Sequence, residues 1–136
     1  MNGLKWLCAL GLVVGSSALA KPIEEDLCRH LSGDWHGSAS YPEFDMQQSW
    51  QASYHPDGRL VLIFTSEHQG AVSESQEVGV WHCYRNLLRS IHAPQGAEDG
   101  MEPMYYHLRR ANQQQIHYVS VSDNGFFGKY FVAYRD

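Results

Sequence analysis

The sequence predicts an all-β domain, an antiparallel up-and-down barrel of about eight strands with a short N-terminal helix. Short apolar or alternating stretches follow one another after Gly33, and tight-turn signals such as Asp57-Gly58 and Asn124-Gly125 separate them. A chain of 136 residues is the size of one domain. Sequential hairpins that close on themselves leave no exposed sheet edge, which favours a barrel over an open sheet.

Residues 1–20 have the pattern of an export signal. Lys5 gives a positive start, residues 6–14 are apolar, and Ala18-Leu19-Ala20 supplies small residues for cleavage. This apolar run is shorter than the roughly 20 residues that span a bilayer. We therefore expect cleavage near Ala20, no transmembrane segment, and a barrel domain over residues 21–136 that is periplasmic or secreted.

Residues 21–31 are expected to form the N-terminal helix. Pro22 suits a first-turn position, and acidic residues lie near the start with basic ones near the end, as the helix dipole favours. Ile23, Leu27 and Leu31 recur every four residues and would form one apolar stripe.

The strands are expected to begin at Trp35. Later strands are predicted over residues 50–54, 60–64, 77–84, 87–92, 104–110, 115–121 and 126–134. Within the segment 115–121, alternation places Ile116, Tyr118 and Ser120 on one face. Residues 67–75 and 93–103 are polar and contain glycine, which predicts two loops.

The cysteines predict one disulfide. Of three cysteines, Cys8 lies in the signal, so Cys28 and Cys83 remain. In an oxidising compartment an isolated pair is most simply a disulfide, and one that closes such a loop stabilises by roughly 4 kcal/mol. The alternative, a reactive or metal-binding pair, is disfavoured because the spacing is not C-x-x-C.

Composition and motifs exclude several functions. The chain has 10 Lys+Arg against 15 Asp+Glu, a net charge of −5, which argues against binding nucleic acid through a basic surface. No Gly-x-Ser-x-Gly signature is present. His82 and Cys83 are adjacent and point to opposite strand faces, and Glu67, Glu74 and Glu77 are expected on a solvated face. We expect no catalytic residues, no metal and no cofactor.

Aromatic residues on the expected strands give the best indication of a site. A barrel of eight strands is either filled by side chains or holds one small ligand. If it is hollow, an aromatic cavity suits a small, partly apolar molecule. The residues expected to line it are Trp50, Tyr54, Phe64, Tyr106, Tyr118 and Phe131.

Three short motifs are spaced along the chain: Gly33-x-Trp35, the Asp57-Gly58 hairpin and Gly79-x-Trp81. In this arrangement the chain resembles the lipocalin and wider calycin superfamily, and small bacterial lipocalin-like domains in particular. The resemblance implies that Trp35 plugs the closed end of the barrel. The chain is shorter than typical lipocalins and shows no helix flanking the barrel at its C-terminus.

A narrower resemblance concerns the opening Gly33-Asp34-Trp35-His36-Gly37, which is similar to nitrobindin-like haem barrels. It implies haem held by a histidine on a late strand, either His107 or His117. These two histidines could also meet His92 across the sheet, although a metal would need further ordered ligands.

The leading hypothesis is an exported lipocalin-like barrel that binds a small apolar, lipid-like molecule non-covalently. This molecule would enter between the loops at 66–75 and 93–103. The alternative is a cell-envelope protein-binding module, an inhibitor or immunity-type factor, that acts through the acidic residues Glu98, Asp99 and Glu102. The haem-binding barrel is the third hypothesis.

Overall fold

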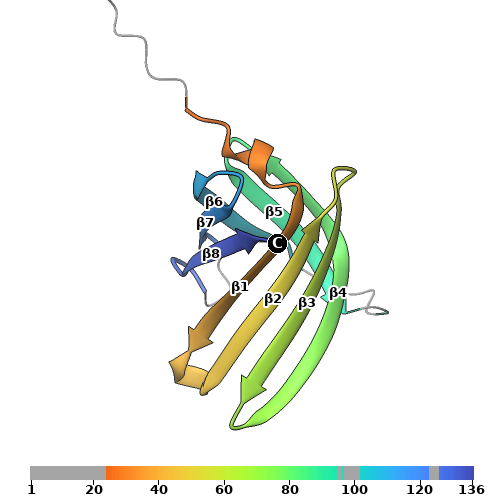
Figure 1. The fold of residues 1–136 in the computed structure, drawn as a ribbon, viewed down its shortest axis with the longest axis vertical. Helices are drawn as coiled ribbons and strands as arrows, with labels where there is room; N and C mark the ends of the chain where they lie inside the picture. The colour runs from red at the N-terminus through yellow and green to blue at the C-terminus, as the bar shows by residue number, and fades with distance from the viewer. Residues whose placement is uncertain (1–23, 95, 97–101, 123–125) are drawn as a thin grey trace, which may run out of the picture.

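The chain folds into a closed antiparallel barrel in which each strand pairs with the next and β8 returns to β1 (Figure 1). The computed structural model describes residues 24–94, 96, 102–122 and 126–136. The predicted eight-stranded up-and-down barrel is confirmed. Its strands are β1 (Gly33–Tyr41), β2 (Met46–Tyr54), β3 (Arg59–His68), β4 (Ala71–Tyr84), β5 (Leu87–Pro94), β6 (Met104–Ala111), β7 (Gln115–Ser120) and β8 (Tyr130–Arg135).

The barrel is closed over only part of its height. β8 pairs with β1 only at residues 35–37, and β5 pairs with β4 only from Glu77 onward. β1 to β4 therefore extend beyond the other four strands as an open sheet, seen at the lower end of Figure 1.

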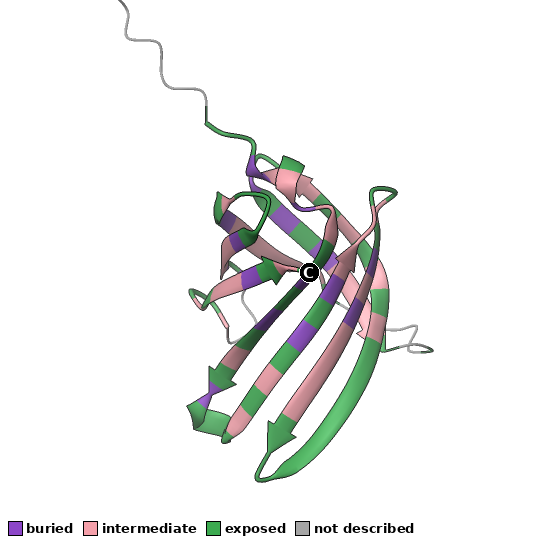
Figure 2. Cartoon of the chain, viewed as in Figure 1, coloured by how far each residue is buried: buried purple, intermediate pink, exposed green. Residues whose placement is uncertain are grey.

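The prediction of a loop at residues 67–75 is wrong. β3 and β4 continue through it as one long hairpin that turns at Gln69 and Gly70, both of which have positive φ. Residues 71–76 are exposed throughout (green in Figure 2) because β5 of the described chain does not extend this far along β4. Such a strand needs no apolar alternation, so its sequence gives no strand signal.

The predicted N-terminal helix is not confirmed. Residues 21–23 lie outside the described part, and the only helical element near the N-terminus of the described chain is one turn of 3₁₀ helix, η1 (Leu27–His30). The Asp26 carboxylate caps it by accepting from the Cys28 backbone N–H at 3.1 Å. Leu27 and Leu31 are nevertheless buried, as their apolar spacing predicted.

The last strand is shorter than predicted. The segment 126–129 is a turn, with Lys129 N–H bonded to the Phe126 carbonyl and Gly128 at positive φ. Phe127 is 74% exposed and lies outside the strands, so its expected place on the last strand is wrong. Residues 123–125, where a tight turn was predicted, lie outside the described chain.

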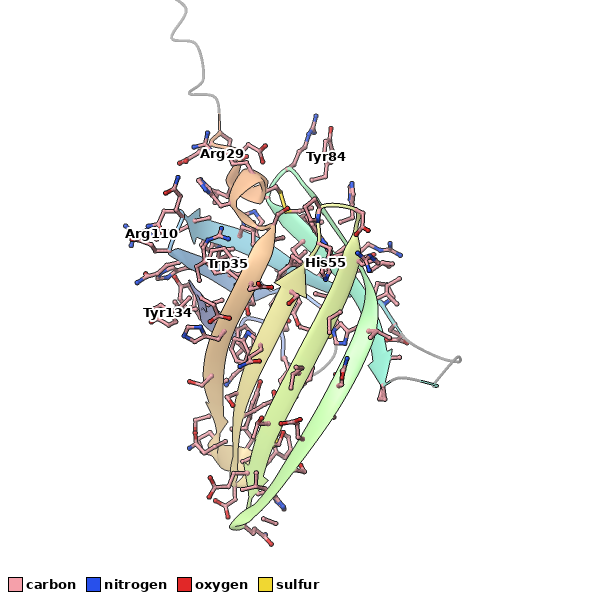
Figure 3. All side chains as sticks on the ribbon, turned by 45° about the vertical axis from the view of Figure 1, so that its right-hand side comes forward. Arg29, Trp35, His55, Tyr84, Arg110 and Tyr134 are labelled. Atoms are coloured by element: carbon pink, nitrogen blue, oxygen red, sulfur yellow. A yellow bond between two sulfur atoms is a disulfide. The ribbon has the colours of Figure 1, made fainter. Side chains whose placement is uncertain are left out.

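A well-packed cluster fills the end of the barrel next to η1. Trp35 is 1% exposed and packs with Leu31, Leu88, Leu108 and other apolar residues there. Its indole N–H donates to the Leu31 carbonyl at 2.8 Å. Figure 3 shows Trp35 at this end of the molecule.

Arg135 of β8 packs over Trp35 at the same end of the barrel. Its guanidinium lies 4.2 Å from the centre of the Trp35 ring and donates to the carbonyls of His30 and Ser32 at 2.8 and 3.0 Å. A third bond reaches the Gln113 carbonyl at 2.6 Å. One side chain thus joins the exit of η1 to the β6–β7 turn.

The predicted disulfide between Cys28 and Cys83 is present and links η1 to β4 (yellow bond in Figure 3). Asn86, in the β4–β5 turn, adds a second link. Its side chain accepts from the Leu27 N–H at 2.8 Å and donates to the Glu25 carbonyl at 2.9 Å. Among the described residues, no helix has the length and apolarity needed to cross a membrane.

Candidate functional site

A cavity of about 290 Å³ occupies the barrel interior on the side away from η1. All six aromatic residues predicted to line a cavity do line this one, contributed by five different strands. Leu60 and Leu62 of β3 and Met46 of β2 add aliphatic surface. The structure thus places the predicted residues around one space, and their role in binding stays a prediction.

Phe131 is at the centre of the aromatic packing. Its ring stacks on Tyr118 with centroids 5.4 Å apart, and it meets Trp50 and Tyr106 edge to face at 5.8 and 6.2 Å. Tyr106 also meets Tyr118 edge to face at 5.3 Å. Offset and edge-to-face pairs of this kind are the favoured arrangements of aromatic rings. The floor of the cavity is therefore a set of mutually supported rings.

Four tyrosines share this interior, and all four have a raised pKa. Burial is the main cause for each, and it raises the pKa of Tyr106 to about 12. The pKa of Tyr118 is raised well above its ordinary value by burial and then by the neighbouring Tyr54, Tyr106 and Tyr41. The pKa values of Tyr54 and Tyr41 are raised as well. The hydroxyls are therefore neutral hydrogen-bonding groups over the whole physiological range.

Two glycines make room for cavity side chains. A Cβ at Gly37 would lie 2.7 Å from an indole carbon of Trp50 and 2.8 Å from the Val132 carbonyl oxygen. A Cβ at Gly79 would lie 2.7 Å from the Cα of His92. Real Cβ atoms do not come this close to other atoms. Trp50 and His92 hold their positions because these two sites lack a side chain.

One wall of the cavity is polar. Glu77 of β4 and His92 of β5 face the interior, with their side chains 16% and 11% exposed. Glu77 Oε1 lies 3.5 Å from His92 Nδ1, and this buried nitrogen has no hydrogen-bond partner within the described chain. Ser75, Ser90 and Gln48 line the same space. The His92 ring also lies 6.3 Å from that of Phe64, so the polar wall adjoins the aromatic one.

The expectation that Glu77 lies on a solvated face is wrong. It is in the register of an inward-facing strand, opposite the buried Leu62. The spacing Glu77-x-Gly79-x-Trp81 could have indicated this, because residues two apart in a strand share a face. Glu67 and Glu74 are exposed, as expected.

The histidines considered for haem do not lie in the cavity. His107 follows the inward-facing Tyr106 on β6, and His117 precedes the inward-facing Tyr118 on β7. Since side chains alternate along a strand, both histidines point to the outside of the barrel. His117 Nδ1 is 2.6 Å from the Tyr130 hydroxyl. His92 is inside and separate from both. Across the described residues, no group of three His, Cys, Asp or Glu is arranged to hold a metal ion.

The predicted entrance differs from the structure on one side. The 66–75 side of the entrance is formed by the long β3–β4 hairpin rather than by a loop. β5 ends at Pro94 and β6 begins at Met104, and residues 95 and 97–101 between them are outside the described chain. Glu98 and Asp99 fall within that gap, so the protein-binding alternative stays a prediction.

Comparison with models of known protein families and with curated proteins found no match.

Proposed function

We propose that this chain binds a small, mainly apolar molecule non-covalently inside the barrel. The observation that supports the proposal is the cavity of about 290 Å³, with aromatic and aliphatic side chains over most of its wall. A cavity of about 150 Å³ accepts benzene. The space here therefore suits a molecule of one or two rings, or a short aliphatic chain, rather than a large lipid.

We also propose that the protein is exported and that it is a lipocalin-like carrier. The signal-like residues 1–20 lie outside the described chain, so this part rests on the sequence pattern. The barrel topology and the Cys28–Cys83 disulfide fit it, because structural disulfides persist mainly in oxidising compartments.

Calorimetric titration with 1-naphthalenemethanol, a neutral two-ring alcohol, tests the proposal. We expect saturable binding to one site per chain. Ser75 lines the cavity and lies on the stretch of β4 beyond its pairing with β5. A Ser75→Trp variant should fill part of the space without disturbing the packed end of the barrel, and it should weaken binding at least about tenfold.

The matched control is Glu74→Trp. Glu74 is the next residue on β4, is exposed, and points to the opposite face of the sheet. This variant adds the same ring outside the barrel and should bind like the original chain. No saturable binding, or equal loss in both variants, would refute an interior site.

A further inference from the structure

The polar wall of the cavity has a charge pattern that restricts its ligand. Within the described chain, Glu77 is the only carboxylate that lines the cavity, and no Lys or Arg lines it. Lys129 touches one lining residue, Tyr41, but its ammonium lies 4.2 Å from the centre of that ring and donates to the Ser40 carbonyl. Among the described residues, His92 is the only basic side chain that lines the wall beside Glu77.

His92 leaves the carboxylate partly unsatisfied. The 3.5 Å separation between Nδ1 and Oε1 does not form a hydrogen bond, and Nδ1 has no other partner in the described part of the chain. The Glu77 carboxylate is an acceptor of hydrogen bonds only, and it has no close donor within the described chain. The Glu77 side chain is largely shielded from solvent and has no close donor, so a ligand that brings a donor adds a favourable hydrogen bond.

An organic ammonium group suits both the Glu77 carboxylate and the aromatic rings of this cavity. It carries three N–H donors, which suit the Glu77 carboxylate and the hydroxyls of Ser75 and Ser90 on the same wall. Its positive charge is also attracted to the faces of aromatic rings such as Phe64, which lies beside His92. A carboxylate ligand such as a fatty acid would instead face Glu77, with no lysine or arginine in the described lining to offset the repulsion.

From this geometry we propose that the ligand is a small aromatic or apolar amine, with its ammonium at Glu77 and His92 and its apolar part against the aromatic floor. The inference rests on the proposed function and adds the chemical class of the ligand. Charge-assisted hydrogen bonds in a site of low polarity are roughly twice as strong as neutral ones, so the amine should be clearly preferred.

Three ligands of nearly the same shape test it by calorimetry: 1-naphthylmethylamine, 1-naphthalenemethanol and 1-naphthoate. The original chain should bind the amine at least about tenfold more tightly than the alcohol, and the carboxylate most weakly. Glu77→Gln, which keeps the side-chain shape, should abolish the preference for the amine over the alcohol. Glu74→Gln, which removes an exposed carboxylate from the same strand, is the matched control and should keep the preference.

Equal affinity of the original chain for amine and alcohol would overturn the inference, and this comparison needs no variant. A preference for the amine that persists in Glu77→Gln would also overturn it, since surface charge would then be the cause. If the alcohol still binds and Ser75→Trp still weakens it, the proposed function stands without the inference. If none of the three ligands binds, both fail.

Discussion

Gly79 shows how a single residue shapes the site. The backbone of β5 comes so close to it that any Cβ would overlap the Ile91 carbonyl and the His92 Cα. Gly79 is also in the spacing that places Glu77 and Trp81 on the same face of β4. Because Gly79 has no side chain, the backbone of β5 at His92 can lie close to β4, which brings His92 next to Glu77.

Gly79→Ala should destabilise the fold by about 1–3 kcal/mol, because backbone must move to admit the methyl group. Urea denaturation followed by circular dichroism measures this. Ser73→Ala, at an exposed position of the same strand, is the control and should change the free energy of unfolding by less than about 0.5 kcal/mol. Equal effects would mean that the close approach at Gly79 does not exist.

The buried tyrosines predict a loss of stability in alkali. Their pKa values in the folded state lie above the unfolded value near 10, so the unfolded chain loses these protons first. The free energy of unfolding therefore keeps its full value below about pH 10 and falls as the pH rises through about 12. Each such tyrosine contributes a slope of up to about 1.4 kcal/mol per pH unit in this window.

Urea denaturation at about pH 8 to 11.5 measures this slope. Tyr118→Phe removes one of the groups and should flatten the decline above about pH 10. Tyr84→Phe, which removes an exposed hydroxyl, should leave it unchanged. A decline that is the same in all three proteins would contradict the burial of Tyr118.

At the scale of elements, the Cys28–Cys83 disulfide and the Asn86 side chain both attach η1 to the β4–β5 hairpin. Asn86 also has a positive φ of 63°, as has Arg85 before it, which is the conformation of a two-residue hairpin turn. The same residue therefore makes the turn and holds the N-terminal segment.

Asn86→Gly separates these two roles, because glycine keeps the turn and removes the side chain. It should cost about 1–3 kcal/mol, since the Leu27 N–H would lose its acceptor. Thermal unfolding of this variant checks the value. Arg85→Gly, at the exposed neighbouring turn position, should have little effect. A neutral Asn86→Gly would show that the link contributes nothing.

Elements were predictable where burial imposes a pattern. The Ile116, Tyr118 and Ser120 face of β7 was predicted correctly because alternation follows burial on one face. Residues 71–76 of β4 were missed because both of their faces are exposed. The extent of the N-terminal helix was overestimated, since Asp26 caps a turn that starts only at Leu27.

At the scale of the whole molecule, strand order and closure could be predicted from short connections, because neighbouring strands joined by tight turns pair with each other. The six aromatic residues around the cavity could be predicted from strand position. The pairing of Glu77 with His92 could not, because it depends on the register between β4 and β5 and on the close approach at Gly79. Residue spacing within one strand carries no information on that register.

The central claim is that a small molecule enters the interior of the barrel and contacts its aromatic floor. Intermolecular NOEs between bound 1-naphthalenemethanol and the protein test it most directly. We predict NOEs from the naphthalene protons to Trp50, Phe64 and Phe131. NOEs confined to outward-facing side chains such as Val80 or Tyr134 would contradict the claim.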